Sequence, residues 1–207
     1  MAGADITDLI SSTIAILRAT IENYNLVKGD KGLRVAFHGA GQGIFLVEEA
    51  LQTTKFQLDG RDLAGDPQTA IRSLEACNIK AKLLESIFKD VAQGPEASRL
   101  ERYITAVRRE SKENTAEALV TGMMNDACDL ANNSTIEAAM KDQVKGLRDA
   151  INELSTMESS VPNELLGDSF SNSSSGRQFN NTKGTQYNST DGGKQFFGNF
   201  TGAVTFN

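Results

Sequence analysis

The chain has 207 residues, enough for one domain with an extension, and a formal net charge of −6. All of the acidic excess lies before Asp168, which argues against nucleic acid as a partner because phosphate binding needs a basic surface. The N-terminus has no signal-peptide pattern, and Cys77 and Cys128 match no metal or redox spacing, so we expect a cytoplasmic protein with free thiols.

The first predicted helix extends from about Asp5 to Tyr24, with apolar residues at every third or fourth position. No charged residue occurs from Leu9 to Leu17, which is unusual for a helix at a protein surface. This run is shorter than the roughly 20 apolar residues that a membrane-spanning helix needs. The apolar stripe of this helix includes Ile6, Leu9, Ile10, Ile14, Leu17 and Ile21.

The second predicted helix covers about Lys31 to Leu58 and contains Gly39, Gly41 and Gly43. A Gly-x-Gly-x-Gly pattern occurs in nucleotide-binding turns, but here no strand precedes it and no Lys-Ser/Thr follows it. We therefore predict a close helix crossing or a kink at these glycines. The single histidine, His38, lies on an apolar helix face, where a packed side chain is expected rather than a catalytic one.

The third predicted helix has Asp66 as its N-cap and Pro67 at its first position, and it ends before Gly94. The fourth opens with Ser98-x-x-Glu101, which has the form of a capping box. Apolar residues continue at helical spacing as far as Leu130, and the polar stretch 110–115 is expected to bend this helix.

The fifth predicted helix opens with a second capping box, Ser134-x-x-Glu137, and ends before Pro162. The fold class expected for residues 1–162 is therefore all-α, a helical bundle of about five helices joined by short connections. No Ser-His-Asp set or metal-spaced cluster can be assembled from the sequence, so we expect no enzyme activity, no cofactor and no metal.

The composition changes sharply after Gly167. Of the 40 residues from Asp168 onward, 26 are Gly, Ser, Thr, Asn or Gln, and none is Leu, Ile or Met. Such a segment cannot build a conventional core, so a disordered tail is expected in the free monomer. The tail nevertheless contains six of the ten phenylalanines, which is not typical of a flexible linker. We assign residues 163–175 to a linker and 176–207 to a motif region.

The motif region repeats a Gly-x-Gln-aromatic unit three times, at spacings of eight and nine residues. In stacked strands, Gln and Asn amides form ladders and aromatic rings stack along the fibril axis, so the repeat predicts cross-β amyloid. The alternative is a disordered low-complexity tail with incidental repeats. The predicted amyloid motif consists of Gly176, Gln178, Phe179, Asn180, Gly184, Gln186, Tyr187, Asn188, Gly193, Gln195, Phe196, Gly198 and Asn199.

Both parts of the chain resemble components of fungal signalling proteins. The bundle contains Cys77-x-x-Lys80-Ala-Lys-Leu-Leu-x-x-Ile87-Phe88 and Ser98-Arg-Leu-Glu-Arg-Tyr103-x-x-Ala-Val107-Arg108. Over residues 10–162 it resembles the SesA-type N-terminal domain of NACHT/NB-ARC receptors, a relative of the HeLo and HeLo-like domains. The Gly-x-Gln-aromatic-Asn units resemble the sigma-type amyloid (prion-forming) motif, and a related pseudopalindromic motif remains an alternative around Gly193 to Asn199.

The resemblance implies a mechanism and partners. An NLR/STAND receptor with a matching amyloid motif would template the tail, and the chains would cluster as an amyloid homo-oligomer. In HeLo-like relatives the N-terminal helix then attacks the plasma membrane. The resemblance therefore implies a programmed-cell-death effector that moves from the cytoplasm to membrane lipids, with the apolar stripe of the first helix as its membrane-active part. The alternative is a non-lytic adaptor whose bundle recruits another helical domain after clustering.

Overall fold

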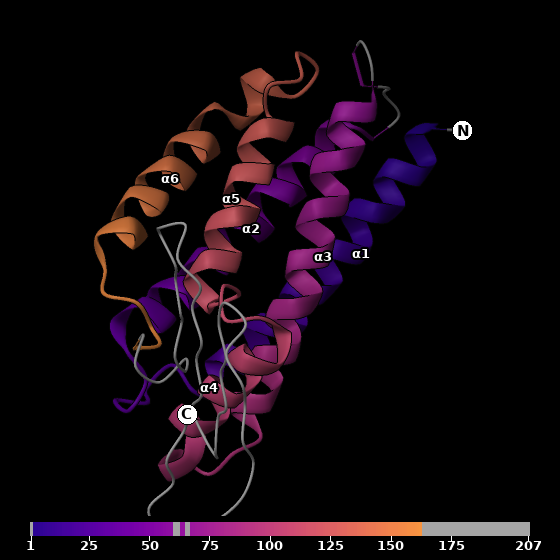
Figure 1. Cartoon of the computed structure of the whole chain (residues 1–207). Helices are drawn as coiled ribbons and strands as arrows, with labels where there is room; N and C mark the ends of the chain where they lie inside the picture. The colour runs from indigo at the N-terminus through magenta and orange to yellow at the C-terminus, as the bar shows by residue number, and fades with distance from the viewer. Residues whose placement is uncertain (1, 60–62, 65–66, 163–207) are drawn as a thin grey trace, which may run out of the picture. The chain divides into compact units, whose positions relative to one another are not determined.

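The computed structural model describes residues 2–59, 63–64 and 67–162, in which the regular elements are helices and no strand occurs (Figure 1). The predicted all-α class is thus confirmed for the bundle. The predicted linker and amyloid motif, 163–207, lie outside the described residues. The described elements are α1 (Ala2–Asn25), α2 (Val35–Gln57), α3 (Pro67–Ala92), the 3₁₀ helix η1 (Glu96–Ser98), α4 (Arg99–Glu110), α5 (Ala116–Leu130) and α6 (Glu137–Thr156).

Four long helices form a closed ring in the order α1, α2, α5, α3, and each packs against its two neighbours in that order. Helix α6 lies at one edge of the bundle against α2 and α5, and α4 packs against α3 (Figure 1). Along the chain the long helices alternate in direction, as short connections require. This arrangement leaves α1 and α6 as the two outer long helices, on different sides of α2.

A cluster of aromatic rings joins four helices near one end of the core. Phe37 of α2 stacks on Phe88 of α3 with ring centroids 4.7 Å apart, and it meets Tyr103 of α4 edge-on at 4.9 Å. Tyr24 of α1 adds a further edge contact to Phe88 at 5.9 Å. Offset and edge-on pairs of this kind contribute about 0.5–1.5 kcal/mol each beyond the burial of their area. The cluster therefore fixes how α1 to α4 meet.

The predicted fourth helix is two helices, so the described residues contain six α-helices rather than about five. The polar stretch 110–115 ends α4 instead of bending it, because Thr115 caps a new helix. The Thr115 hydroxyl accepts a hydrogen bond from the backbone N–H of Ala118 at 3.4 Å. Asn114 closes the intervening turn by donating its backbone N–H to the Ser111 carbonyl at 2.9 Å.

Both predicted capping boxes are wrong in detail. The Ser98 hydroxyl donates to the Pro95 carbonyl at 3.1 Å and makes no cap bond to α4. Helix α6 begins at Glu137 with Ile136 as its N-cap, so Ser134 lies in the preceding turn. In each case a tight turn upstream takes up the backbone groups that the capping box would have satisfied.

The predicted second helix begins at Val35 rather than at Lys31. The Asp30 carboxylate accepts a hydrogen bond from the backbone N–H of Gly32 at 2.8 Å, which forms an Asx turn. The same carboxylate, only 2% exposed, pairs with Arg99 at 3.2 Å. The turn is thus held by a partner from the α3–α4 region, and residues 31–34 cannot join the helix.

The predicted close crossing at the glycines of α2 is confirmed. A Cβ atom at Gly41 would lie 2.3 Å from the Tyr24 ring of α1, and one at Gly43 would lie 2.6 Å from Val120 of α5. A Cβ atom at Gly39 would lie 2.9 Å from a leucine of α6. Three neighbouring helices therefore approach the backbone of α2 where it has no side chains.

We predict that Gly41→Ala destabilises the bundle while Gly146→Ala does not. Alanine at Gly41 meets the Tyr24 ring, and overpacking of this kind costs about 1–3 kcal/mol. Gly146 of α6 has open space around it, so alanine there gains helix propensity, up to about 1 kcal/mol. Urea unfolding followed by circular dichroism measures both changes, and equal stability of the two variants would contradict the close crossing.

Candidate functional site

Helix α1 carries the predicted membrane-active stripe, and the structure brings that stripe together on one face of the helix. The face packs against α2 and α3 and is part of the hydrophobic core. The exposed fractions are 3% for Ile6, 0% for Ile10, 6% for Ile14 and 0% for Leu17. Leu9 and Ile21 are partly buried against the same core. The stripe is therefore covered by the bundle in this state.

A buried polar contact joins α1 to α3 within this apolar interface. The Asn78 side chain donates its Nδ2–H to Thr13 Oγ1 at 2.9 Å, and the Thr13 hydroxyl donates to the Leu9 carbonyl at 2.8 Å. Thr13 is 0% exposed and Asn78 is 6% exposed. A buried donor that loses its acceptor costs free energy, so this contact favours one register of α1 on α3.

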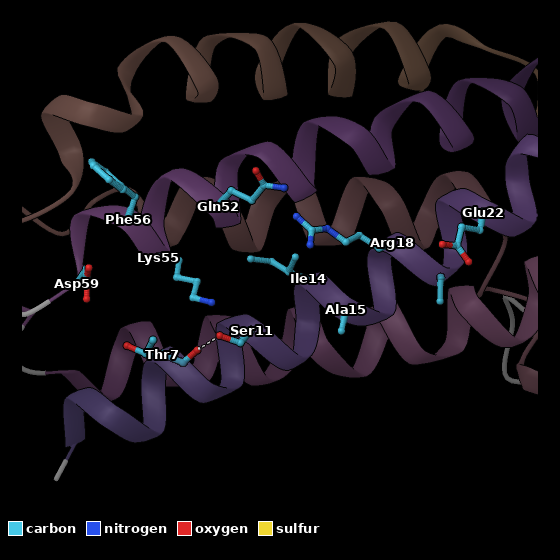
Figure 2. Close-up of a pocket in the computed structure, with 11 residues that line it drawn as sticks. Thr7, Ser11, Ile14, Ala15, Arg18, Glu22, Gln52, Lys55, Phe56 and Asp59 are labelled. Carbon is cyan, nitrogen blue, oxygen red and sulfur yellow. Dashed lines mark hydrogen bonds between the residues drawn. The ribbon is translucent and has the colours of Figure 1, made fainter.

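A neighbouring face of α1 borders an open groove of about 700 Å³ along α2, and Ile14 of the apolar stripe also lines it (Figure 2). Ala15 lines it between Ser11 and Arg18, and Gln52 and Lys55 line it from α2. The Arg18 Nε atom lies 2.7 Å from Glu48 Oε1 and bridges the two helices across the groove. On the groove face, small residues and a surface ion pair hold α1 less tightly than the buried apolar stripe does.

The sequence pattern identified the apolar stripe of α1 but missed the partner of Thr13. Asn78 stands between Cys77 and Ile79 in an otherwise helical pattern, and a single polar residue there gives no sign of its partner. One feature of the sequence points to this pair: Thr13 and Asn78 are polar residues that each fall on the buried face of a predicted helix. A buried polar residue usually needs a hydrogen-bond partner, so such pairs are worth seeking.

The groups considered for catalysis are occupied by structural contacts. The His38 Nε2–H donates to the Asp30 carbonyl at 2.8 Å, as a packed helical histidine would. Burial raises the pKa of the Cys77 thiol to about 12. Lys80 pairs with Asp126 at 2.7 Å, and its side chain is 29% exposed. No group of metal-binding residues occurs in the described ranges.

Two family models match the chain, one for each of its two parts. A family model described as SesA, the N-terminal domain on NACHT NTPases and P-loop NTPases, matches residues 10–130. The chain belongs to the SesA family. A second model, described as the sigma domain on NACHT NTPases, matches residues 167–207. The resemblance of both parts is thus confirmed, and the two domains link the chain to NACHT NTPases. No curated protein and no solved structure matches it.

The SesA match runs from within α1 to the end of α5 and leaves out α6. Residues 131–166, which include α6, therefore lie between the two matched ranges. The SesA part includes both residues of the Thr13–Asn78 contact and four of the six residues of the apolar stripe of α1. Within the described part of this SesA protein, no helix is both long enough and apolar enough to cross a membrane.

We predict that Thr13→Val loosens α1 and destabilises the protein by about 1–3 kcal/mol, because the buried Asn78 amide then lacks its acceptor. Thr13→Ser, which keeps the hydroxyl, is the matched control. Adding Asn78→Leu to Thr13→Val should recover part of the loss, since both polar partners are then gone. Thermal unfolding and hydrogen exchange of α1 measure these changes, and identical exchange in the valine and serine variants would refute the role of the contact.

Proposed function

We propose that this chain is a programmed-cell-death effector that a NACHT NTPase with a sigma domain activates by templating the tail. The observation that carries the proposal is the pairing of two domains that are described on NACHT NTPases. Only residues 131–166 separate them here, too few for an NTPase domain, and α6 occupies much of that segment. A chain with both domains and no NTPase between them is suited to receive a signal from such an NTPase.

The proposed signal is transmitted through cross-β stacking of the tail. The three glutamines of the repeat can hydrogen-bond to their copies in adjacent chains, and the three aromatic rings can stack in the same direction. With a net charge of about +1 from Asp168 onward, the tail has little electrostatic repulsion to oppose stacking. Clustering of this kind would raise the local concentration of the attached bundles.

The proposed target of the clustered bundles is the plasma membrane, reached from the cytoplasm, and the proposed membrane-active element is α1. Its stripe is apolar, and the run from Leu9 to Leu17 carries no charge. In the bundle this stripe is covered by α2 and α3, so α1 has to leave them before it can contact lipid. The proposal involves no catalytic step, in keeping with the structural contacts of His38 and the raised pKa of Cys77.

A second candidate, the non-lytic adaptor, is favoured by the same burial. Because Ile10 and Leu17 belong to the core, releasing α1 disrupts the bundle, whereas an adaptor keeps it intact. Helix α2 also exposes two large apolar side chains, Phe45 at 41% and Phe56 at 77%, which are available to a partner helix. Phe56 lies on the α2 side of the groove that α1 borders, whereas Phe45 is not among the residues that line this groove (Figure 2).

The tail proposal predicts that a peptide of residues 171–207 forms fibrils with a strand spacing of roughly 4.7 Å. Replacing Gln178, Gln186 and Gln195 by proline should abolish assembly, because proline removes a backbone donor and fixes φ. Proline at Ser173 and Ser174, in the predicted linker, is the matched control and should have little effect. Fibre diffraction and thioflavin fluorescence provide the measurement, and equally fast assembly of the glutamine variant would disprove the repeat as the core.

The effector and adaptor candidates differ in what Ser12→Asp does. Ser12 is exposed on α1, so the substitution should change folding stability by no more than about 0.5 kcal/mol. A carboxylate in the uncharged run should nevertheless cost about 3 kcal/mol in lipid and suppress leakage of vesicles made of phosphatidylcholine and phosphatidylserine.

In this leakage assay, protein seeded with tail fibrils is added to dye-loaded vesicles, with Ser12→Ala as the control. The effector predicts strong leakage for the wild type and Ser12→Ala and little for Ser12→Asp. Leakage that is absent from all three variants, although fibrils form, would favour the adaptor.

A further inference from the structure

The segment that follows α6 folds back onto the bundle, and we call residues 157–162 the strap. Two of its residues, Ser160 and Val161, are 0% exposed although no helix or strand includes them. The strap precedes the sigma-matched range by only four residues. It is therefore the last described part of the chain before the tail.

A partly buried hydrogen-bond network holds the strap at the corner between α4 and α5. The Glu117 carboxylate accepts the backbone N–H of Ser160 at 2.9 Å and also the Ser160 hydroxyl. Because a carboxylate can only accept, the Ser160 hydroxyl is the donor in that bond, and its oxygen accepts the hydroxyl of Tyr103. The Tyr103 oxygen in turn accepts the backbone N–H of Ala116 at 2.9 Å.

The network places one carboxylate where three strap donors converge. The Ser159 hydroxyl also donates to Glu117, at 3.0 Å. Burial, followed by the charge of Glu117, raises the pKa of Tyr103, so this hydroxyl keeps its proton and remains a donor. Arg34, at the start of α2, donates to the Ser159 carbonyl at 3.0 Å from the other side. The partners of Ser159 and Ser160 thus come from α4, α5 and the start of α2 rather than from α6.

Helix α6 is held more lightly than the other long helices of the bundle. Within α6, the buried residues are Met140, Leu147 and Leu154, and the helix contacts α2 and α5 alone among the described elements. It also lies outside the SesA match. Ile136, which is buried in the core, anchors the start of α6. The strap restrains its C-terminal end, so both ends of the helix are held.

If tails stack, the strap is the first described element on which the resulting pulling force acts. Adjacent strands in a cross-β stack are roughly 4.7 Å apart, whereas a single helix with its side chains is about 10 Å wide. Bundles on successive tails cannot follow that spacing and have to spread away from the stack. The connection to each bundle emerges from the strap, so this displacement pulls on Ser160 and its neighbours.

We propose that the strap is a clasp that couples the tail to the bundle. Tail assembly draws Ser159 to Val161 away from Glu117 and Tyr103, and α6 then separates from α2 and α5. The trigger in this inference rests on the proposed function of the tail. The clasp itself, meaning the dependence of α6 on Glu117 and Ser160, is a property of the unassembled chain and is tested without fibrils.

The first arm of the test is hydrogen exchange of the full chain as a monomer. Glu117→Gln replaces one of the two acceptor oxygens of the carboxylate by a donor. Glu158→Gln is the matched control in the strap, because the Glu158 side chain is 92% exposed and its ion pair with Arg34, at 3.8 Å, is a weak surface contact. We expect the Ser160 amide and the amides of α6 to exchange about tenfold faster or more in Glu117→Gln, with α3 unchanged and the control like the wild type.

Ser160→Ala provides a second variant that removes the bridging hydroxyl and leaves the charge of Glu117 in place. It should accelerate exchange in α6 in the same way. If α6 keeps its protection in both variants, the clasp does not exist. If α3 and α6 accelerate equally, Glu117 stabilises the whole bundle and the coupling role is refuted.

The second arm follows exchange in the wild-type full chain after seeding with fibrils of the 171–207 peptide. We expect the strap and α6 to lose protection while α3 keeps it. Fibrils with an unchanged strap would overturn the coupling and leave the proposed function standing. Absence of fibrils would overturn the proposed function and the trigger together, while the monomer arm still decides whether the clasp holds α6.

Discussion

The bundle depends on the close approach of three helices to the backbone of α2. Gly41 accepts the Tyr24 ring of α1, Gly43 lies against α5, and Gly39 lies against α6. Side chains at these positions would push the neighbouring helices outward and open the core, which is packed at crystal-like density. The element proposed to act on membranes and the element proposed to sense the tail are thus both positioned by the same short stretch of α2.

The two outer helices differ in the kind of contact that holds them. The stripe of α1 buries at least four large aliphatic side chains, each contributing about 1.5–3 kcal/mol. The strap is held mainly by hydrogen bonds, which contribute about 0.5–1.5 kcal/mol each and about 1.5–3 kcal/mol when one partner is charged. The two costs are of similar size, so their order follows from the chain itself. The strap adjoins the tail in sequence, and in the proposed mechanism α6 therefore responds to tail assembly first.

Local patterns in the sequence predicted the existence of the helices, because apolar periodicity and the residues at Pro67 and Gly94 act over a few positions. They predicted boundaries less well, since the turns at 30–34 and 111–115 depend on Arg99 and on the Thr115 cap. The contacts of Glu117 with Ser160 and of Thr13 with Asn78 were not predictable. Each joins residues more than 40 positions apart, and nothing local marks such partners.

Separation of α6 alone does not free α1 in this fold. Helix α1 contacts α2 and α3 but not α6, and its buried bond runs from Thr13 to Asn78 of α3. After α6 leaves, the Tyr24 ring still packs on Gly41, and the apolar stripe still faces the core. The proposed effector therefore needs a second input that favours an exposed apolar helix, and a lipid surface supplies it. Without a lipid surface, α1 keeps its place on α2 and α3, which is what the adaptor candidate requires of it.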